Sequence, residues 1–137
     1  MKKLFKPLFA LAIITSALVS SCGKYEEGPK ISLASKKSRL CGDWTIEKLT
    51  SDGVDMTSFV SGMTLDIEKD GGYKMTLGAM KDEGKWELGE DKDDVFFTSN
   101  DTGSVKQSYR ILRLKSKEMK LRYTNTNGKY DVYEYKQ

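Results

Sequence analysis

From about residue 39 to the C-terminus, hydrophobic and polar residues alternate in short runs, as expected for β-strands with one buried face. In the run 63–68, for example, Met63, Leu65 and Ile67 share one face. Turn-forming segments such as Asp70-Gly71-Gly72 separate the runs. The pattern predicts eight strands, at 44–49, 63–68, 73–77, 84–88, 95–98, 104–115, 119–123 and 130–135.

Little sequence lies between these runs, and none of it predicts a crossover helix. Only residues 55–60 have a helical character, with Asp55 as a cap and Phe59 as a plug. In the run 104–115 the alternation breaks, which indicates a β-bulge. The chain is therefore expected to be all-β, an antiparallel up-and-down meander of about eight strands. Closure into a barrel would remove its exposed edges, and a β-sandwich is the main alternative.

The N-terminal segment differs from the rest because it is basic and then apolar. Lys2, Lys3 and Lys6 precede an apolar run, and the small residues Ser20-Ser21 precede Cys22. This order is typical of a signal peptide, and Thr15-Ser16 leaves the run shorter than the ~20 residues of a membrane-spanning helix. Cys22 directly after small residues resembles a lipobox. We therefore expect cleavage of residues 1–21 and lipidation of Cys22; the alternatives are an uncleaved anchor and a secreted protein with a chance cysteine.

Lipidation would make the chain a membrane-anchored lipoprotein. One acyl chain such as palmitate binds a bilayer marginally, whereas two or three hold a protein stably. Lys24, Glu26 and Glu27 follow the cysteine and resemble the surface-export signal of some Gram-negative lipoproteins. We expect a lipid-anchored outer-membrane protein exposed at the cell surface. Residues 22–38, with little apolar periodicity, are interpreted as a flexible lipidated tether to a domain at 39–137.

Composition restricts the chemistry of that domain. The chain has 23 basic and 20 acidic residues, and removal of the three signal-peptide lysines leaves no net charge or basic stripe for nucleic acid. It has no histidine, which removes the commonest general base and most zinc sites. The acidic run 90–94 lacks the spacing of a calcium loop and is interpreted as a solvated hairpin loop. We expect no enzyme activity, no metal and no cofactor.

Cys41 has no disulfide partner once Cys22 is lipidated. A small packed residue is the favoured interpretation, because lone cysteines usually behave as small hydrophobes. A reactive thiol is the alternative, although no basic residue stands immediately beside Cys41.

The segment Gly42-Asp43-Trp44, followed by a short helical turn and a series of hairpins, resembles the lipocalin-like members of the calycin superfamily. Gly71-Gly72-Tyr73, Gly84-Lys85-Trp86 and the segment 117–121 follow in a similar order. From about 40 to 137 the chain is similar to small lipocalin-like lipoproteins of Gram-negative bacteria. The resemblance implies a barrel in which Trp44 packs across the closed end beneath an arginine, for which Arg122 is the candidate and Arg113 a weaker one.

An eight-stranded barrel is wide enough to be filled by side chains or to hold one small ligand. The first hypothesis is therefore a small apolar ligand in the barrel, and the alternative is a filled barrel acting as an accessory of an outer-membrane protein complex. In the first, Phe59 gates the pocket. The candidates for the barrel interior or ligand contacts are Trp44, Phe59, Leu65, Met75, Leu77, Trp86 and Tyr123.

Overall fold

The computed structural model describes residues 33–137, and the lipobox, Lys24, Glu26 and Glu27 lie outside them. These residues form two short helices and nine strands. None of the described helices is long and apolar enough to cross a membrane. In chain order the elements are α1 (Leu33–Leu40), β1 (Gly42–Ser51), β2 (Val54–Asp55), the 3₁₀ helix η1 (Thr57–Val60), β3 (Thr64–Ile67), β4 (Gly72–Leu77), β5 (Met80–Leu88), β6 (Asp94–Ser99), β7 (Gln107–Leu114), β8 (Glu118–Thr124) and β9 (Tyr130–Lys136).

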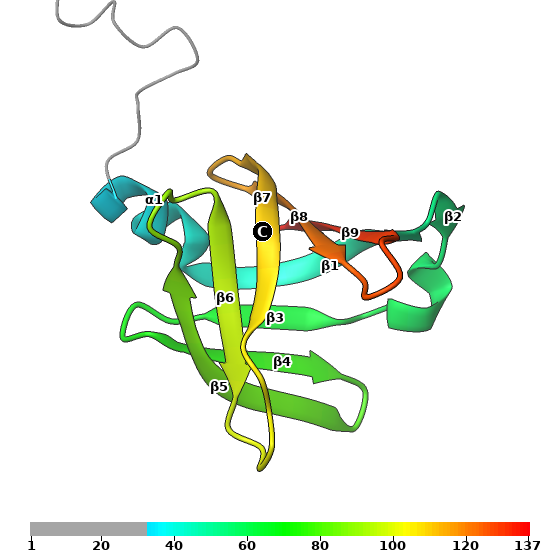
Figure 1. Ribbon diagram of the computed structural model, residues 1–137, viewed down its shortest axis with the longest axis horizontal. Coiled ribbons are helices and arrows are strands. Elements are labelled where there is room, and N and C mark those ends of the chain that lie inside the picture. The colour runs from blue at the N-terminus through cyan, green and yellow to red at the C-terminus, as the bar shows by residue number, and fades with distance from the viewer. Residues whose placement is uncertain (1–32) are drawn as a thin grey trace, which may run out of the picture. The chain divides into compact units, whose positions relative to one another are not determined.

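The strands form one antiparallel sheet that closes on itself (Figure 1). From β3 to β9 each strand pairs with the next, and β1 pairs with both β3 and β9. Two parts of β1 close the barrel. Gly42 to Thr45 pair with β3, and Thr45 to Ser51 pair with β9. The result is an eight-stranded up-and-down barrel, with β2 as an extra short strand on β1. The predicted barrel is therefore confirmed, and the sandwich alternative is wrong.

Local sequence explains the tight connections between strands. In the β3–β4 turn, Gly71 has φ of +99°, a conformation that side chains disfavour and glycine adopts readily. The Asp70 carboxylate accepts a hydrogen bond from the Gly72 N–H over 2.9 Å, which fixes the same turn. The predicted bulge in 104–115 is present in β7, between Ile111 and Arg113.

Helix α1 corrects the expectation of a flexible tether through residue 38. Residues 33–38 are helical, so the folded unit begins before residue 39. The helix ends at Leu40, which is fully buried. The indole Nε1–H of Trp44 donates to the Leu40 carbonyl over 2.8 Å. Contacts with the barrel stabilise this helix, and the residue pattern of so short a segment does not show them.

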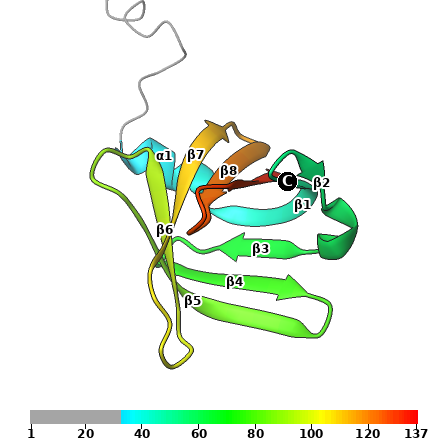
Figure 2. The same cartoon turned by 45° about the vertical axis from the view of Figure 1, so that its right-hand side comes forward.

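Figures 1 and 2 show α1 at one end of the barrel, and η1 with β2 at the other. We call these the closed end and the open end. The most deeply buried side chains lie in the half of the barrel nearer α1, and interior close packing is what stabilises this half. They are Trp44, Leu40, Ile67, Met119, Leu121 and Val95.

Candidate functional site

Most inward-facing side chains at the open end are only partly buried, whereas the fully buried side chains lie nearer α1. The partly buried side chains come from every long strand except β3, whose inward residues are buried. None of them is as deeply buried as the side chains near α1. These side chains therefore keep some exposure to solvent, while four of them, Met75, Leu77, Tyr109 and Tyr133, also pack against the core. The partly buried residues are Leu49, Ser51, Met75, Leu77, Asp82, Ser99, Tyr109, Tyr123, Asp131 and Tyr133.

Aromatic rings line the inner wall next to this opening. The centroid of the Phe97 ring is 5.0 Å from that of Tyr73 and 5.6 Å from that of Tyr109. The Tyr109 ring is in turn 5.3 Å from Tyr123 and 6.0 Å from Tyr133. These separations are typical of interacting aromatic pairs. The five rings, from β4, β6, β7, β8 and β9, form a continuous cluster that we call the tyrosine array.

The hydroxyl groups of Tyr109 and Tyr133 are in a poorly hydrated environment. Burial raises the pKa of Tyr109 above its ordinary value, and the neighbouring Tyr133 and Tyr123 add to the shift. Burial likewise raises the pKa of Tyr133, with a further contribution from the Asp131 carboxylate. These phenols are therefore neutral hydrogen-bonding groups near pH 7.

Two carboxylates face inward beside the array. Asp82 of β5 accepts a hydrogen bond from the Tyr73 hydroxyl over 2.7 Å at one oxygen, and one from the Ser99 hydroxyl at the other. Asp131 of β9 accepts one from the Ser51 hydroxyl over 2.6 Å. Neither carboxylate forms a salt bridge within residues 33–137.

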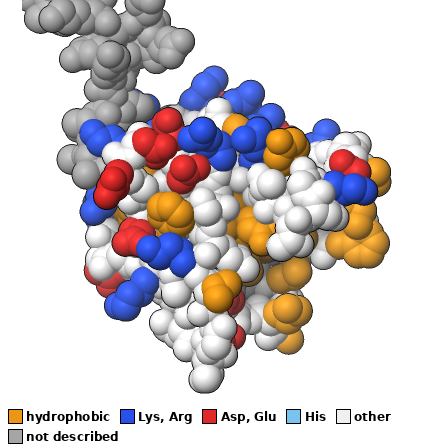
Figure 3. Space-filling model, viewed as in Figure 1, with side chains coloured by type: hydrophobic (Ala, Val, Ile, Leu, Met, Phe, Trp, Pro, Cys, Tyr) orange, Lys and Arg blue, Asp and Glu red, His pale blue; other side chains and the backbone are white. Residues whose placement is uncertain are grey.

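Exposed hydrophobic residues surround the open end. Val54 and Phe59 lie on β2 and η1, Met80 begins β5 after the β4–β5 turn, Val105 is in the β6–β7 loop and Tyr130 begins β9. Figure 3 shows hydrophobic side chains gathered over η1 and the β4–β5 turn. We call these five residues the rim.

Six of the predicted interior residues face the inside of the barrel. Trp44, Leu65 and Trp86 are buried members of the core. Met75, Leu77 and Tyr123 are partly buried at the open end, where a ligand could contact them. The structure therefore divides the predicted set into a packed group and an accessible group.

The interior placement of Phe59 is wrong. Its side chain is 72% exposed on η1, so it does not plug the barrel. The helical turn holds the aromatic ring on the rim, because the Asp55 carboxylate accepts hydrogen bonds from the backbone N–H and the hydroxyl of Thr57. Sequence spacing alone could not distinguish an inward from an outward ring on a single turn.

Arg122 is not placed to close the barrel beneath Trp44. It alternates outward between the buried Leu121 and the inward Tyr123, and its guanidinium carbon lies 4.6 Å from the centroid of the Tyr130 ring. A guanidinium nitrogen of Arg113, the weaker candidate, lies 3.5 Å from a carboxylate oxygen of Glu118. The partner of the Trp44 indole is instead the carbonyl that ends α1.

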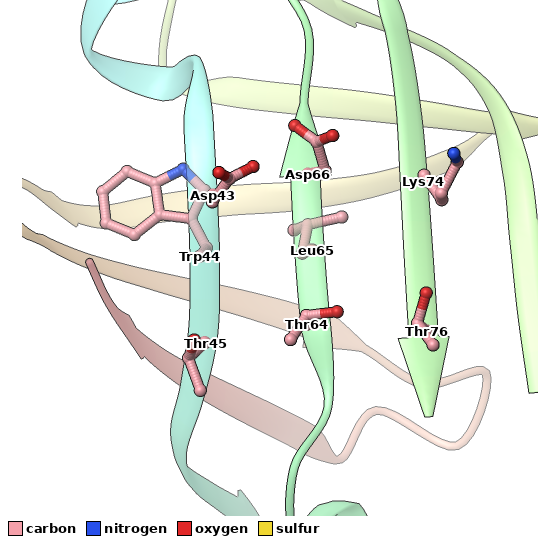
Figure 4. A pocket seen from close by; sticks show the side chains of 8 residues that line it. All are labelled: Asp43, Trp44, Thr45, Thr64, Leu65, Asp66, Lys74 and Thr76. Atoms are coloured by element: carbon pink, nitrogen blue, oxygen red, sulfur yellow. The ribbon is translucent and has the colours of Figure 1, made fainter. Parts of the chain in front are cut away.

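A separate groove of about 300 Å³ lies on the outer face of β1, β3 and β4 (Figure 4). The register places Asp43, Asp66 and Lys74 side by side in one row across these strands, and three threonines in another. Partial burial, and then the neighbouring Asp43, raise the pKa of Asp66. Trp44 and Leu65 also belong to the lining, so the groove combines charged, hydroxyl and apolar groups.

The other candidates for chemistry are weak. The side chain of Arg110 lies within 4 Å of carboxylates of the acidic loop at Asp91, Asp93 and Asp94, which supports a charge-balanced surface loop. Cys41 packs against the core, and burial raises the pKa of its thiol, which opposes reactivity. Within residues 33–137 no three Cys, Asp or Glu side chains converge as metal ligands.

Sequence reasoning missed Asp82, Asp131, Tyr109 and Tyr133 as site residues. The available signal was the alternation of strand residues between two faces. Asp82 is spaced by two and four residues from Gly84 and Trp86, and Asp131 by two and four from Tyr133 and Tyr135, so each carboxylate shares the face of these residues. A carboxylate at an inward position costs free energy unless it is hydrogen-bonded, so its presence there is informative.

Comparison with solved structures identifies a similar fold. A lipocalin-like protein from Bacteroides uniformis superposes with a TM-score of 0.56 at 14% sequence identity, covering 72% of this chain and 98% of the other. No protein-family model and no curated protein sequence matches the chain. The similarity in structure shows that the barrel has a lipocalin-like fold.

Proposed function

We propose that this protein binds a small ligand with an apolar body at the open end of its lipocalin-like barrel, without catalysing a reaction. The observation that carries the proposal is the difference between the two ends. Side chains near α1 are fully buried, whereas Met75, Leu77 and three rings of the tyrosine array are only partly buried beneath an apolar rim. The three rings are those of Tyr109, Tyr123 and Tyr133. Apolar walls with a few placed polar groups are typical of small-molecule sites.

A fluorescent probe tests this proposal. Residues 33–137 carry every strand of the barrel and its core, so a chain that starts at Gly23 keeps the folded unit and lacks acyl chains that would compete. N-phenyl-1-naphthylamine, which is uncharged and fluoresces in apolar surroundings, should bind with one-to-one stoichiometry. Leu77→Trp should abolish binding by filling the opening. Leu112→Trp is the matched control, because Leu112 is exposed on β7. Unchanged binding by Leu77→Trp, or no binding at all, would contradict the proposal.

We further propose that the protein is an outer-membrane lipoprotein anchored through Cys22 and exposed at the cell surface. The support is the sequence pattern: a basic start, a short apolar run, small residues and then cysteine. Cys22→Ser should move the protein from the membrane fraction to the soluble fraction, whereas Cys41→Ser should not. Protease treatment of intact cells should degrade the wild-type protein if it is on the outside. Membrane attachment that persists in Cys22→Ser would disprove lipidation.

A further inference from the structure

The inner wall of the barrel carries charge of one sign. Alternation along the strands of residues 33–137 places Asp82 and Asp131 inward, and no lysine or arginine. The basic side chains of these strands lie on the outer face, where Lys120 and Lys136 pair with surface glutamates. The inner wall at the open end therefore carries two carboxylates among apolar, phenolic and serine side chains.

Both carboxylates keep hydrogen-bonding capacity for a ligand. An ionised carboxylate has about four acceptor sites. Asp82 uses two of them, for Tyr73 and Ser99, and Asp131 uses one, for Ser51. The hydroxyl groups hold each carboxylate in place without neutralising it. A partly buried charge of this kind is stabilised most by an ion of opposite sign.

The tyrosine array favours a ligand of the same charge type. The faces of aromatic rings carry negative electrostatic potential and attract cations within ~6 Å of the ring centroid. Tyr109 contacts Phe97, Tyr123 and Tyr133, so rings from several strands meet in one region. The Asp131 carboxylate is close enough to perturb both Tyr109 and Tyr133. Carboxylate and aromatic groups thus lie together at the opening.

We infer that the ligand of the open end is a small organic cation, an amine whose ammonium group contacts Asp82 or Asp131 and whose apolar part lies against the tyrosine array and the rim. This inference rests on the proposed binding function and names the chemical class of its ligand. An ammonium group donates up to three hydrogen bonds, which match the free acceptor sites of the carboxylates. An anionic ligand of the same shape would face two carboxylates with no cation in the wall.

A matched series of ligands separates charge from shape. Decylammonium, 1-decanol and decanoate share one apolar chain and differ in the head group, and each is titrated as a competitor of N-phenyl-1-naphthylamine. Decylammonium should bind about tenfold more tightly than decanol, because one charge-assisted hydrogen bond contributes affinity of this order. Decanoate should bind more weakly than decanol. Asp82→Asn and Asp131→Asn should each reduce the advantage of decylammonium, and the double variant should remove it. Decanol binding should stay unchanged, which shows that the variants remain folded.

Glu83→Gln provides the control for charge. Glu83 is the neighbour of Asp82 on β5 but is exposed on the outer face. Glu83→Gln therefore changes the net charge of the protein by the same amount as Asp82→Asn and leaves the inner wall intact. If the three competitors bind equally, or the advantage of decylammonium survives in the double variant, the inference is wrong and the binding function stands. If neither the probe nor any competitor binds the wild-type protein, the binding function itself fails.

Discussion

The contact between Trp44 and α1 makes a sharp prediction about stability. The Trp44 side chain has no solvent exposure, and its Nε1–H donates to the Leu40 carbonyl over 2.8 Å. That carbonyl belongs to the last residue of α1, where helical carbonyls lack partners within the helix. Trp44→Phe keeps an aromatic ring and removes the donor, so the Leu40 carbonyl is left buried without this hydrogen bond.

The expected cost has two parts. Leaving a buried acceptor unsatisfied costs about 1–3 kcal/mol. A void of a few tens of Å³, at about 24 cal/mol per Å³, adds roughly 1 kcal/mol. The free energy of unfolding should therefore fall by about 2–4 kcal/mol, which lowers Tm by on the order of 10–20 °C for a domain of this size. Amide exchange near Cys41, whose N–H bonds to the Lys37 carbonyl, should also accelerate because α1 is released.

Chemical denaturation followed by circular dichroism measures the change, with Trp86→Phe as the matched comparison. The Trp86 indole donates to the Glu68 carbonyl over 2.7 Å, but Glu68 is exposed, so water can replace the lost donor. Trp86→Phe should consequently cost less than Trp44→Phe. Equal costs for the two variants, or a Trp44→Phe protein with unchanged exchange in α1, would refute the role of this hydrogen bond.

Three further predictions follow from burial and close approach. Gly84→Ala should destabilise the barrel by about 1–3 kcal/mol in urea denaturation, because a Cβ there would overlap the Thr98 carbonyl oxygen; an expressed variant with wild-type stability would contradict the β5–β6 spacing. Burial raises the pKa of Tyr109 and Tyr135, so the unfolded state loses protons first above pH 10 and stability should fall as pH rises further. Tyrosinate absorbance and circular dichroism should change together in that titration. Ionisation of all tyrosines with the fold intact would contradict the burial of Tyr109 and Tyr135. Phe59→Ser should change stability by less than ~0.5 kcal/mol, because the ring is exposed, while probe binding weakens if the rim contributes.

The residue pattern predicted each of the eight barrel strands but not every boundary. Strand β7 begins at Gln107 rather than at 104, and β1 extends to Ser51, where it pairs with the unpredicted β2. The bulge between Ile46 and Lys48 was also unexpected, because the alternation there looked regular. Strand ends depend on the partner strand that supplies the hydrogen bonds, and a single run of residues does not identify its partner.

The candidate site was predicted less completely than the fold. Met75, Leu77 and Tyr123 were assigned inward and are inward, because parity decides the face. Their depth along the barrel was not predictable, so they could not be separated from the packed Trp44 and Leu65. The exposed ring of Phe59 was predicted to face inward, because a hydrophobic residue at a turn gives no directional signal.

What the sequence by itself determined are properties of consecutive residues: strand periodicity, turn positions, the absence of histidine and the lipobox-like N-terminus. Only the tertiary structure decided which end is packed and which is open, because α1 covers one end and the β1–β9 pairing joins residues from opposite ends of the barrel sequence. The same closure brings the Asp131 carboxylate to Tyr109 and hydrogen-bonds it to Ser51. Alternation is local, whereas these contacts depend on register and closure across strands, and the charge of the opening follows from them.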